Sequence, residues 1–120
     1  MLKVFGFLVR KPGLERQAFI DHYENEHIPL ICRLATIPTV YKRNYVVRGD
    51  GSNLPFNEER GDVDFDVVTE LVFADRAAFQ AWQGELSRPG VGEQVVADEE
   101  RFLDRSRTRA YVIEEYVTAG

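Results

Sequence analysis

The stretch Leu2-Lys-Val-Phe-Gly-Phe-Leu-Val-Arg10 decides the fold of this chain. Read as a strand, it has apolar side chains on both faces: Leu2, Val4 and Leu8 on one, and Phe5, Phe7 and Val9 on the other. Strands of this kind belong to sheets that are covered on both sides. Both faces of the sheet therefore need a covering layer.

Outward from this strand, periodic apolar patterns predict six more elements. The predicted helices are 15–28, 76–84 and 91–102, with Asp75 as the N-cap of the second. Further strands are predicted at 39–48, 63–73 and 107–116. Pro29 is expected to end or kink the first helix. The long loop 49–62 is expected to border a binding pocket, since loops of this length are often lids.

This order of strands and helices predicts an α+β fold. It is the ferredoxin-like split βαβ arrangement, in which a four-stranded antiparallel sheet carries helices on one face. The helices cover only one face, whereas strands 2–10 and 107–116 are apolar on both. We therefore expect a homodimer whose two sheets face each other. The alternative is a monomer with an apolar surface, which is uncommon for a large patch.

Composition limits the partners and the location. A net charge of −5, from 15 basic and 20 acidic residues, argues against nucleic acid or an anionic membrane as partner. No stretch approaches the roughly 20 apolar residues of a membrane span, and the first ten residues lack the features of a signal peptide. One cysteine excludes an internal disulfide, so we expect a cytoplasmic protein. Its 120 residues predict a single domain, 1–120.

His27 is the leading candidate for chemistry. It lies on the same helical stripe as Phe19 and Tyr23, so its imidazole points into an aromatic-lined space. Such a group is suited to act as a general base near neutral pH. The alternative is a core histidine that donates to a carbonyl. His22 and Glu26, four residues apart, are expected to form a solvated pair that faces away from His27, and no metal is expected.

Two strands supply the other candidate residues. Tyr41 and Asn44 lie on opposite faces of one strand, so one of them can share a pocket with His27 and stabilise an enolate oxygen. Asp66 and Glu70 share a strand face and can orient His27 or relay a proton, or else pair with arginines. The expected catalytic residues are His27, Asn44 and Glu70, and the expected substrate-binding residues are Phe19, Tyr23, Tyr41, Phe56 and Asp66.

Five short motifs, in consistent order, carry a resemblance to a known family. They are RKPGL at 10–14, the F-x-x-x-Y-x-x-x-H-x-P-L pattern at 19–30, YKRN at 41–44, DVVTELVF at 66–73 and ADEERFLD at 97–104. Together they resemble the EthD family over roughly residues 3–115. The chain lacks the GxGxxG, GxxxxGK[ST], HExxH, CxxC and GxSxG signatures of other enzyme classes.

The resemblance implies a dimeric α/β barrel and supports His27 as the catalytic residue. Relatives in that family include polyketide dehydratases and methylmuconolactone isomerases, which act by proton transfer without cofactors. The expected function is therefore that of a cofactor-free lyase or isomerase acting on a small cyclic or aromatic, polyketide-like or lactone substrate. The alternatives are a non-catalytic small-molecule binding or stress-related module, or a heme-binding protein on the same scaffold.

Overall fold

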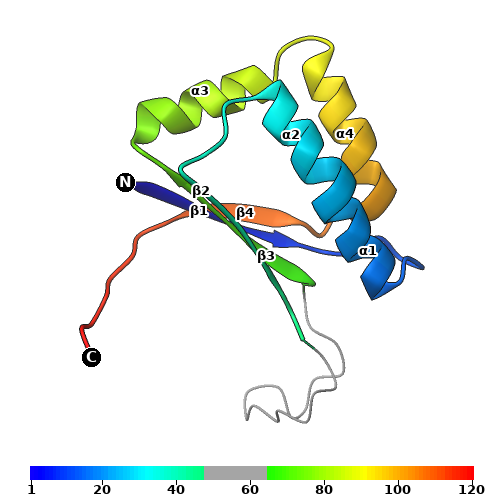
Figure 1. The fold of residues 1–120 in the computed structure, drawn as a ribbon, viewed down its shortest axis with the longest axis horizontal. Coiled ribbons are helices and arrows are strands. Elements are labelled where there is room, and N and C mark those ends of the chain that lie inside the picture. The colour runs from blue at the N-terminus through cyan, green and yellow to red at the C-terminus, as the bar shows by residue number, and fades with distance from the viewer. Residues whose placement is uncertain (48–64) are drawn as a thin grey trace.

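The helices and strands follow the predicted order (Figure 1). A computed structural model describes residues 1–47 and 65–120. These form β1 (Leu2–Leu8), α1 (Arg16–His22), the π-helix η1 (Tyr23–His27), α2 (Ile28–Leu34), β2 (Val40–Tyr45), β3 (Val67–Phe73), α3 (Arg76–Leu86), α4 (Val91–Phe102) and β4 (Arg109–Ile113). The predicted loop 49–62, with Phe56, lies outside the described residues.

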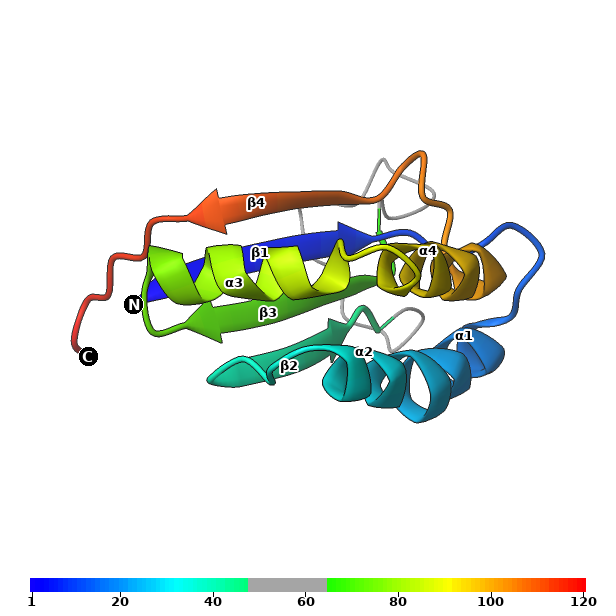
Figure 2. The same cartoon turned by 90° about the horizontal axis from the view of Figure 1, so that it is seen from above.

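The four strands form one antiparallel sheet in the order β2-β3-β1-β4. The helices of the described residues lie on one face of this sheet (Figures 1 and 2). The predicted α+β, ferredoxin-like arrangement is thereby confirmed. Between the layers, two buried clusters form the core: Phe19, Tyr23, Val67, Phe102 and Leu103 in one, and Val4, Leu71 and Phe73 in the other.

The first helical region differs from its prediction at Pro29. The chain stays helical from Arg16 to Leu34, with a wider π turn over Tyr23–His27. The Ile28 amide donates to the Tyr23 carbonyl, five residues back. Pro29 then falls in the first turn of α2, where a residue without an N–H group is tolerated. Of the two expectations for Pro29, that it ends the helix is therefore wrong, whereas the regular α-helical pattern is interrupted just before it, by the π turn.

The ends of the remaining elements are close to those expected. The predicted helix 91–102 is confirmed as α4. Asp75 caps α3, since its carboxylate accepts a hydrogen bond from the Ala78 amide at 2.8 Å. The third strand begins later than predicted, at Val67. Asp66, just before it, donates its amide to the Leu8 carbonyl at 2.8 Å, and its carboxylate accepts from the Arg10 amide at 2.6 Å.

The sheet face away from the helices carries an aromatic cluster. The Phe7 ring lies 5.2 Å from that of Phe65 and 6.1 Å from that of Tyr111, and Phe5 is adjacent to Phe7 on the same face. Tyr111 is 56% exposed. We call this surface the open face. The prediction that β1 is apolar on both faces is confirmed, and the open face is the one that a second copy is expected to cover.

Hydropathy adds one further observation on the helices. In the part of the chain that the structure describes, no helix combines the length and apolar character needed to cross a membrane.

Candidate active site

The π turn brings His22 and His27 to the same side of the helical region. In an α-helix, residues five apart point about 140° away from each other. The i→i+5 hydrogen bonding of η1 widens the turn, so that residues with this spacing lie nearly one above the other. Both side chains therefore face α4. The expectation that His22 points away from His27 into solvent is wrong, because it assumed α-helical geometry throughout.

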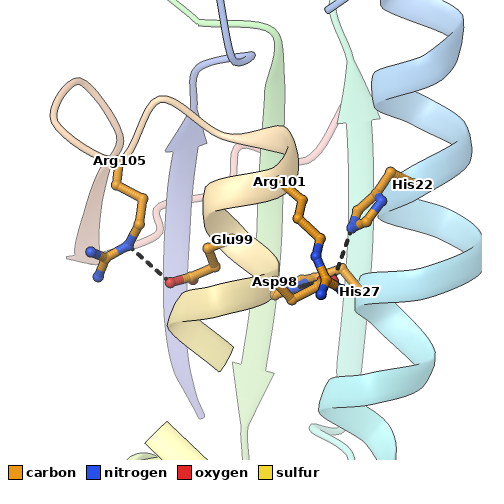
Figure 3. Close-up of polar contacts among 6 residues, drawn as sticks. All are labelled: His22, His27, Asp98, Glu99, Arg101 and Arg105. Atoms are coloured by element: carbon orange, nitrogen blue, oxygen red, sulfur yellow. Dashed lines mark hydrogen bonds and ion pairs between the residues drawn. The ribbon is translucent and has the colours of Figure 1, made fainter. Parts of the chain in front are cut away.

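Both histidines bind the carboxylate of Asp98 on α4 (Figure 3). His27 Nδ1 lies 2.7 Å from Oδ2, and His22 Nε2 lies 3.0 Å from Oδ1. Arg101 Nη1 is more distant, at 3.5 Å from Oδ1. Asp98 is 5% exposed and His27 6% exposed. The site is thus a buried His–Asp pair supported by a second histidine.

Burial and hydrogen bonding set the charge states of this pair. Burial lowers the pKa of His27 and outweighs its hydrogen bond to Asp98, which acts to raise it. For Asp98, burial disfavours the charged form, but the hydrogen bonds from His27 and His22 outweigh it and lower the pKa of the carboxyl. Near neutral pH the site therefore holds a neutral imidazole beside an ionised carboxylate.

The hydrogen bond to Asp98 also fixes the tautomer of His27. An ionised carboxylate only accepts, so Nδ1 carries the proton and Nε2 carries the lone pair. Among residues 1–47 and 65–120, Nε2 makes no hydrogen bond. The rings of Phe102 and Tyr23 flank the imidazole, with centroids 4.9 Å and 5.7 Å away. This arrangement gives His27 the form of a general base.

A cavity of about 200 Å³ lies next to His27, between the sheet and the helices. Its walls are mainly apolar side chains: Val4, Leu8, Ile31, Leu71, Trp82, Leu86, Val95 and Leu103. His27, Tyr23, Tyr41 and Thr69 supply polar atoms. Glu99 also lines the cavity and pairs with Arg105 at 3.1 Å (Figure 3). A small apolar molecule with few polar groups matches such a lining.

The polar side chains on the sheet side of the cavity carry hydroxyl groups. Tyr23 Oη lies 2.6 Å from Thr69 Oγ1, and Tyr41 lines the same cavity. Burial raises the pKa of Tyr23 to about 12 and also raises the pKa of Tyr41 well above its ordinary value. Both phenols therefore stay protonated at neutral pH and are able to donate.

The register of β2 on β3 decides which of Tyr41 and Asn44 shares the cavity with His27. Tyr41 pairs with Leu71 and faces the helices, so it is the one that shares the cavity with His27. Asn44 pairs with Val68 and donates its amide to the Val68 carbonyl at 3.1 Å, on the open face. The expectation of Asn44 as a catalytic residue beside His27 is therefore wrong.

Neither predicted carboxylate takes the place beside His27. Glu70 lies on the open face, 3.7 Å from Lys3 Nζ and 3.9 Å from Lys42 Nζ. Asp66 binds the backbone and side chain of Arg10 and does not line the cavity. The expectation that Glu70 orients His27 is wrong, because successive strand residues point to opposite faces and Thr69 takes the helix side. Asp98 is the orienting carboxylate.

Phe19 and Phe56 are the other residues expected to bind the substrate. Phe19 is fully buried behind the cavity, packed on Tyr23, Tyr45 and Phe102, and supports the lining residues rather than joining them. Tyr23 does line the cavity, as expected. Phe56 lies outside the described residues.

Asp98 is the residue that the sequence reasoning missed. It belongs to the quoted motif at 97–104, and its position in α4 also carries a signal. Val91, Val95, Asp98 and Phe102 follow the spacing of one helical stripe, so Asp98 is a carboxylate among inward-facing apolar residues. A charged residue in that position is rarely buried without a partner.

A second ion pair holds η1 on the sheet. Arg43 on β2 donates to Glu24 through Nε at 2.9 Å and through Nη2 at 2.5 Å, and Tyr45 Oη donates to it at 2.6 Å. These contacts fix the π turn, and with it His27, relative to the strand that carries Tyr41.

Within residues 1–47 and 65–120, no cluster of three or more His, Cys, Asp or Glu side chains has the arrangement of a metal site.

The antiparallel sheet with helices on one face, and a His–Asp pair beside the cavity between them, defines a small α+β protein with a ferredoxin-like fold. A profile of the EthD domain matches residues 11–106. The chain belongs to the EthD family.

Solved structures share the fold of this chain. An EthD family protein from Bacillus halodurans superposes with a TM-score of 0.62 at 22% identity, covering 97% of this chain and 100% of that one. The protein At3g17210 of Arabidopsis thaliana gives 0.61 at 11% identity, covering 99% of each chain. HapK from Hahella chejuensis gives 0.58 at 13% identity, covering 100% of this chain and 97% of that one. No curated protein matches the sequence.

Proposed function

We propose that this EthD protein is a cofactor-free enzyme that moves a proton on a small cyclic or aromatic substrate, by dehydration or isomerisation. The observation that carries the proposal is the 2.7 Å contact between His27 Nδ1 and Asp98 Oδ2 beside the cavity. A carboxylate in this position fixes the tautomer of the imidazole and stabilises the imidazolium that forms when the base accepts a proton.

In the proposed reaction, His27 Nε2 removes a proton from a carbon next to a substrate carbonyl. The electron pair of the C–H bond moves to the carbonyl oxygen and forms an enolate. The enolate then either expels a hydroxyl group, which leaves as water with the proton from His27, or takes that proton back at another carbon. The first outcome is a dehydration and the second an isomerisation, and neither needs an oxidant or reductant.

Tyr41 is the proposed hydrogen-bond donor to the enolate oxygen. Tyr41 lines the cavity together with His27 and Tyr23, and burial keeps its phenol protonated and able to donate. A fixed donor of this kind in a water-poor site is worth far more than the same donor in water.

The cavity supports the proposed substrate class. Aliphatic and aromatic side chains form most of its wall, and at about 200 Å³ it suits a compound of one or two small rings. The same lining would suit a binding module without catalysis, which is the second candidate function. A porphyrin is larger than this cavity, so heme binding has less support, and a Soret band in the purified protein is its direct test.

We also propose that two copies pair through the open face. Phe5, Phe7, Phe65 and Tyr111 gather on this side of the sheet, where the described residues contribute no helix. Burying an aromatic cluster of this size is favourable by about 25 cal/mol for each Å² of apolar area removed from water.

Solvent-deuterium exchange tests the catalytic proposal. The wild-type protein is incubated in D₂O with α-tetralone or with α-angelica lactone, and loss of the proton signals next to the carbonyl is followed by NMR. We expect exchange above the buffer rate, lowered by roughly 10²–10⁴ in His27→Ala. Asp21→Asn is the matched control, since Asp21 is on the exposed side of α1 and bonds Gln17. Binding of either probe without exchange would favour the binding module.

A further inference from the structure

His22 binds the same carboxylate as the proposed base but takes no part in the proton transfer described above. Its Nε2 lies 3.0 Å from Asp98 Oδ1 (Figure 3). Its ring stacks on Phe102, with centroids 4.9 Å apart and planes inclined by 29°. Its side chain is 22% exposed, so it forms the outer edge of the buried pair.

We propose that His22 is a positioning residue, which holds the second oxygen of Asp98 so that the carboxylate stays aimed at Nδ1 of His27 and keeps His27 in its base-active tautomer. The inference rests on the proposed function for its catalytic consequence. Its structural consequence, the tautomer of His27, does not depend on any substrate.

The geometry of the carboxylate explains why a second donor matters. His27 binds only Oδ2, and a single hydrogen bond leaves the carboxylate plane able to turn about its side-chain torsions. A donor on Oδ1 removes that freedom, in the way that outer partners orient ligating histidines and carboxylates elsewhere. His22 supplies this donor at hydrogen-bond distance.

Arg101 is the other group at Oδ1, and it is a weak substitute for His22. Its Nη1 lies at 3.5 Å, near the limit for a hydrogen bond, and its side chain is 70% exposed. An exposed arginine one turn along the same helix adds little, because solvent screens it. The fixed donor at this oxygen is therefore His22.

Loss of His22 has a chemical consequence at His27. With one close donor instead of two, the Asp98 carboxylate is free to turn about its side-chain torsions. When the carboxylate turns away, the Nδ1–H group has no acceptor, and the proton of the neutral imidazole can move to Nε2 instead. The imidazole then presents an N–H group to the cavity in place of its lone pair, and it is no longer a base.

Two substitutions separate this role from simple packing. His22→Phe keeps an aromatic ring on Phe102 but removes the donor. His22→Gln keeps an N–H donor but removes the ring. If His22 only fills space, the first variant resembles the wild type and the second is the damaged one. If His22 holds Asp98, the order is reversed.

The readout is the ¹⁵N chemical shifts of the His27 ring, recorded at pH 8 without any substrate. We expect wild type and Asp21→Asn to show one protonated nitrogen at Nδ1. We expect His22→Phe to show shifts averaged between the two tautomers, and His22→Gln to return toward the wild-type values. In the exchange assay, His22→Phe should lower kcat by about tenfold with KM little changed, as for other orienting partners.

Wild-type ¹⁵N shifts in His22→Phe would overturn the proposal. If that variant does not fold, His22→Gln decides alone: wild-type shifts support the role of the donor, and altered shifts reject it. The two proposals fail separately. Full exchange activity in His27→Ala removes the catalytic function but leaves the tautomer result standing, whereas unchanged shifts in His22→Phe remove the role of His22 alone.

Discussion

His27 Nδ1 and Asp98 Oδ2 lie 2.7 Å apart although 71 positions separate the two residues in the chain. The contact joins the π turn after α1 to the third turn of α4, which is why it depends on the fold as a whole. Phe102, one turn beyond Asp98, packs on the rings of both His22 and His27. Chemistry and core packing are therefore provided by the same helix face.

Asp98→Asn should abolish most of the activity and cost moderate stability. The amide accepts a hydrogen bond through one atom and donates through the other, so one histidine must change its tautomer. Exchange into α-tetralone or α-angelica lactone should fall by roughly 10²–10⁴ if His27 is the one that changes. Loss of hydrogen bonds to a charged group should lower the free energy of unfolding by about 1–3 kcal/mol, measured by urea denaturation. Unchanged exchange by a folded Asp98→Asn protein whose ¹⁵N shifts show the proton of His27 on Nε2 would rule out the His–Asp pair.

The pH dependence of exchange should report His27. The base acts when neutral, and its pKa is lowered from the model-peptide value of 6.5 by burial. Activity should therefore be level above pH 6.5 and fall as the pH drops through the lower pKa of the folded protein. The stability follows the same sign: because the unfolded state binds the proton more tightly, folding weakens as pH falls below 6.5. An exchange rate that falls only above pH 7 would contradict a neutral histidine base.

The sequence predicts those features of the fold that a regular apolar pattern within one element reports. The period-2 and period-3.6 patterns of 2–10 and 91–102 report burial of each element, and both elements are present. The π turn leaves no such trace, because a window read with one period cannot show a local change of period. Its consequence is large, since it decides whether His22 faces solvent or Asp98.

In the candidate site, too, the features set by local sequence were predicted and those set by contacts between distant elements were not. The stripe of Phe19, Tyr23 and His27 is local to one helical region, and all three are buried as expected. The partner of His27 is set by how α4 lies against η1, which no local pattern encodes. The choice between Tyr41 and Asn44 needed the register of β2 on β3. Sequence spacing had shown only that the two lie on opposite faces.

Tyr41→Phe should separate catalysis from binding. The variant keeps the ring in the cavity wall but removes the hydroxyl proposed to donate to the enolate oxygen. Exchange should fall by about 10²–10³, the usual cost of losing one such donor, with little change in the affinity for α-tetralone by titration. Tyr116→Phe is the matched control, since that hydroxyl is on the exposed C-terminal segment. Equal exchange in the two variants would assign the enolate contact elsewhere.

Phe7→Asp should prevent the proposed face-to-face dimer from forming. Phe7 lies at the centre of the open face, where its ring meets Phe5, Phe65 and Tyr111. A carboxylate there would be buried without a partner in a face-to-face dimer, which costs several kcal/mol, whereas a monomer leaves it in water. Light scattering at micromolar concentration should give the wild type twice the chain mass of 13.8 kDa and the variant a single chain mass. Ile37→Asp makes the same change at an exposed apolar residue outside the open face and should remain dimeric. A wild-type protein with the mass of one chain would show that the open face stays uncovered in solution.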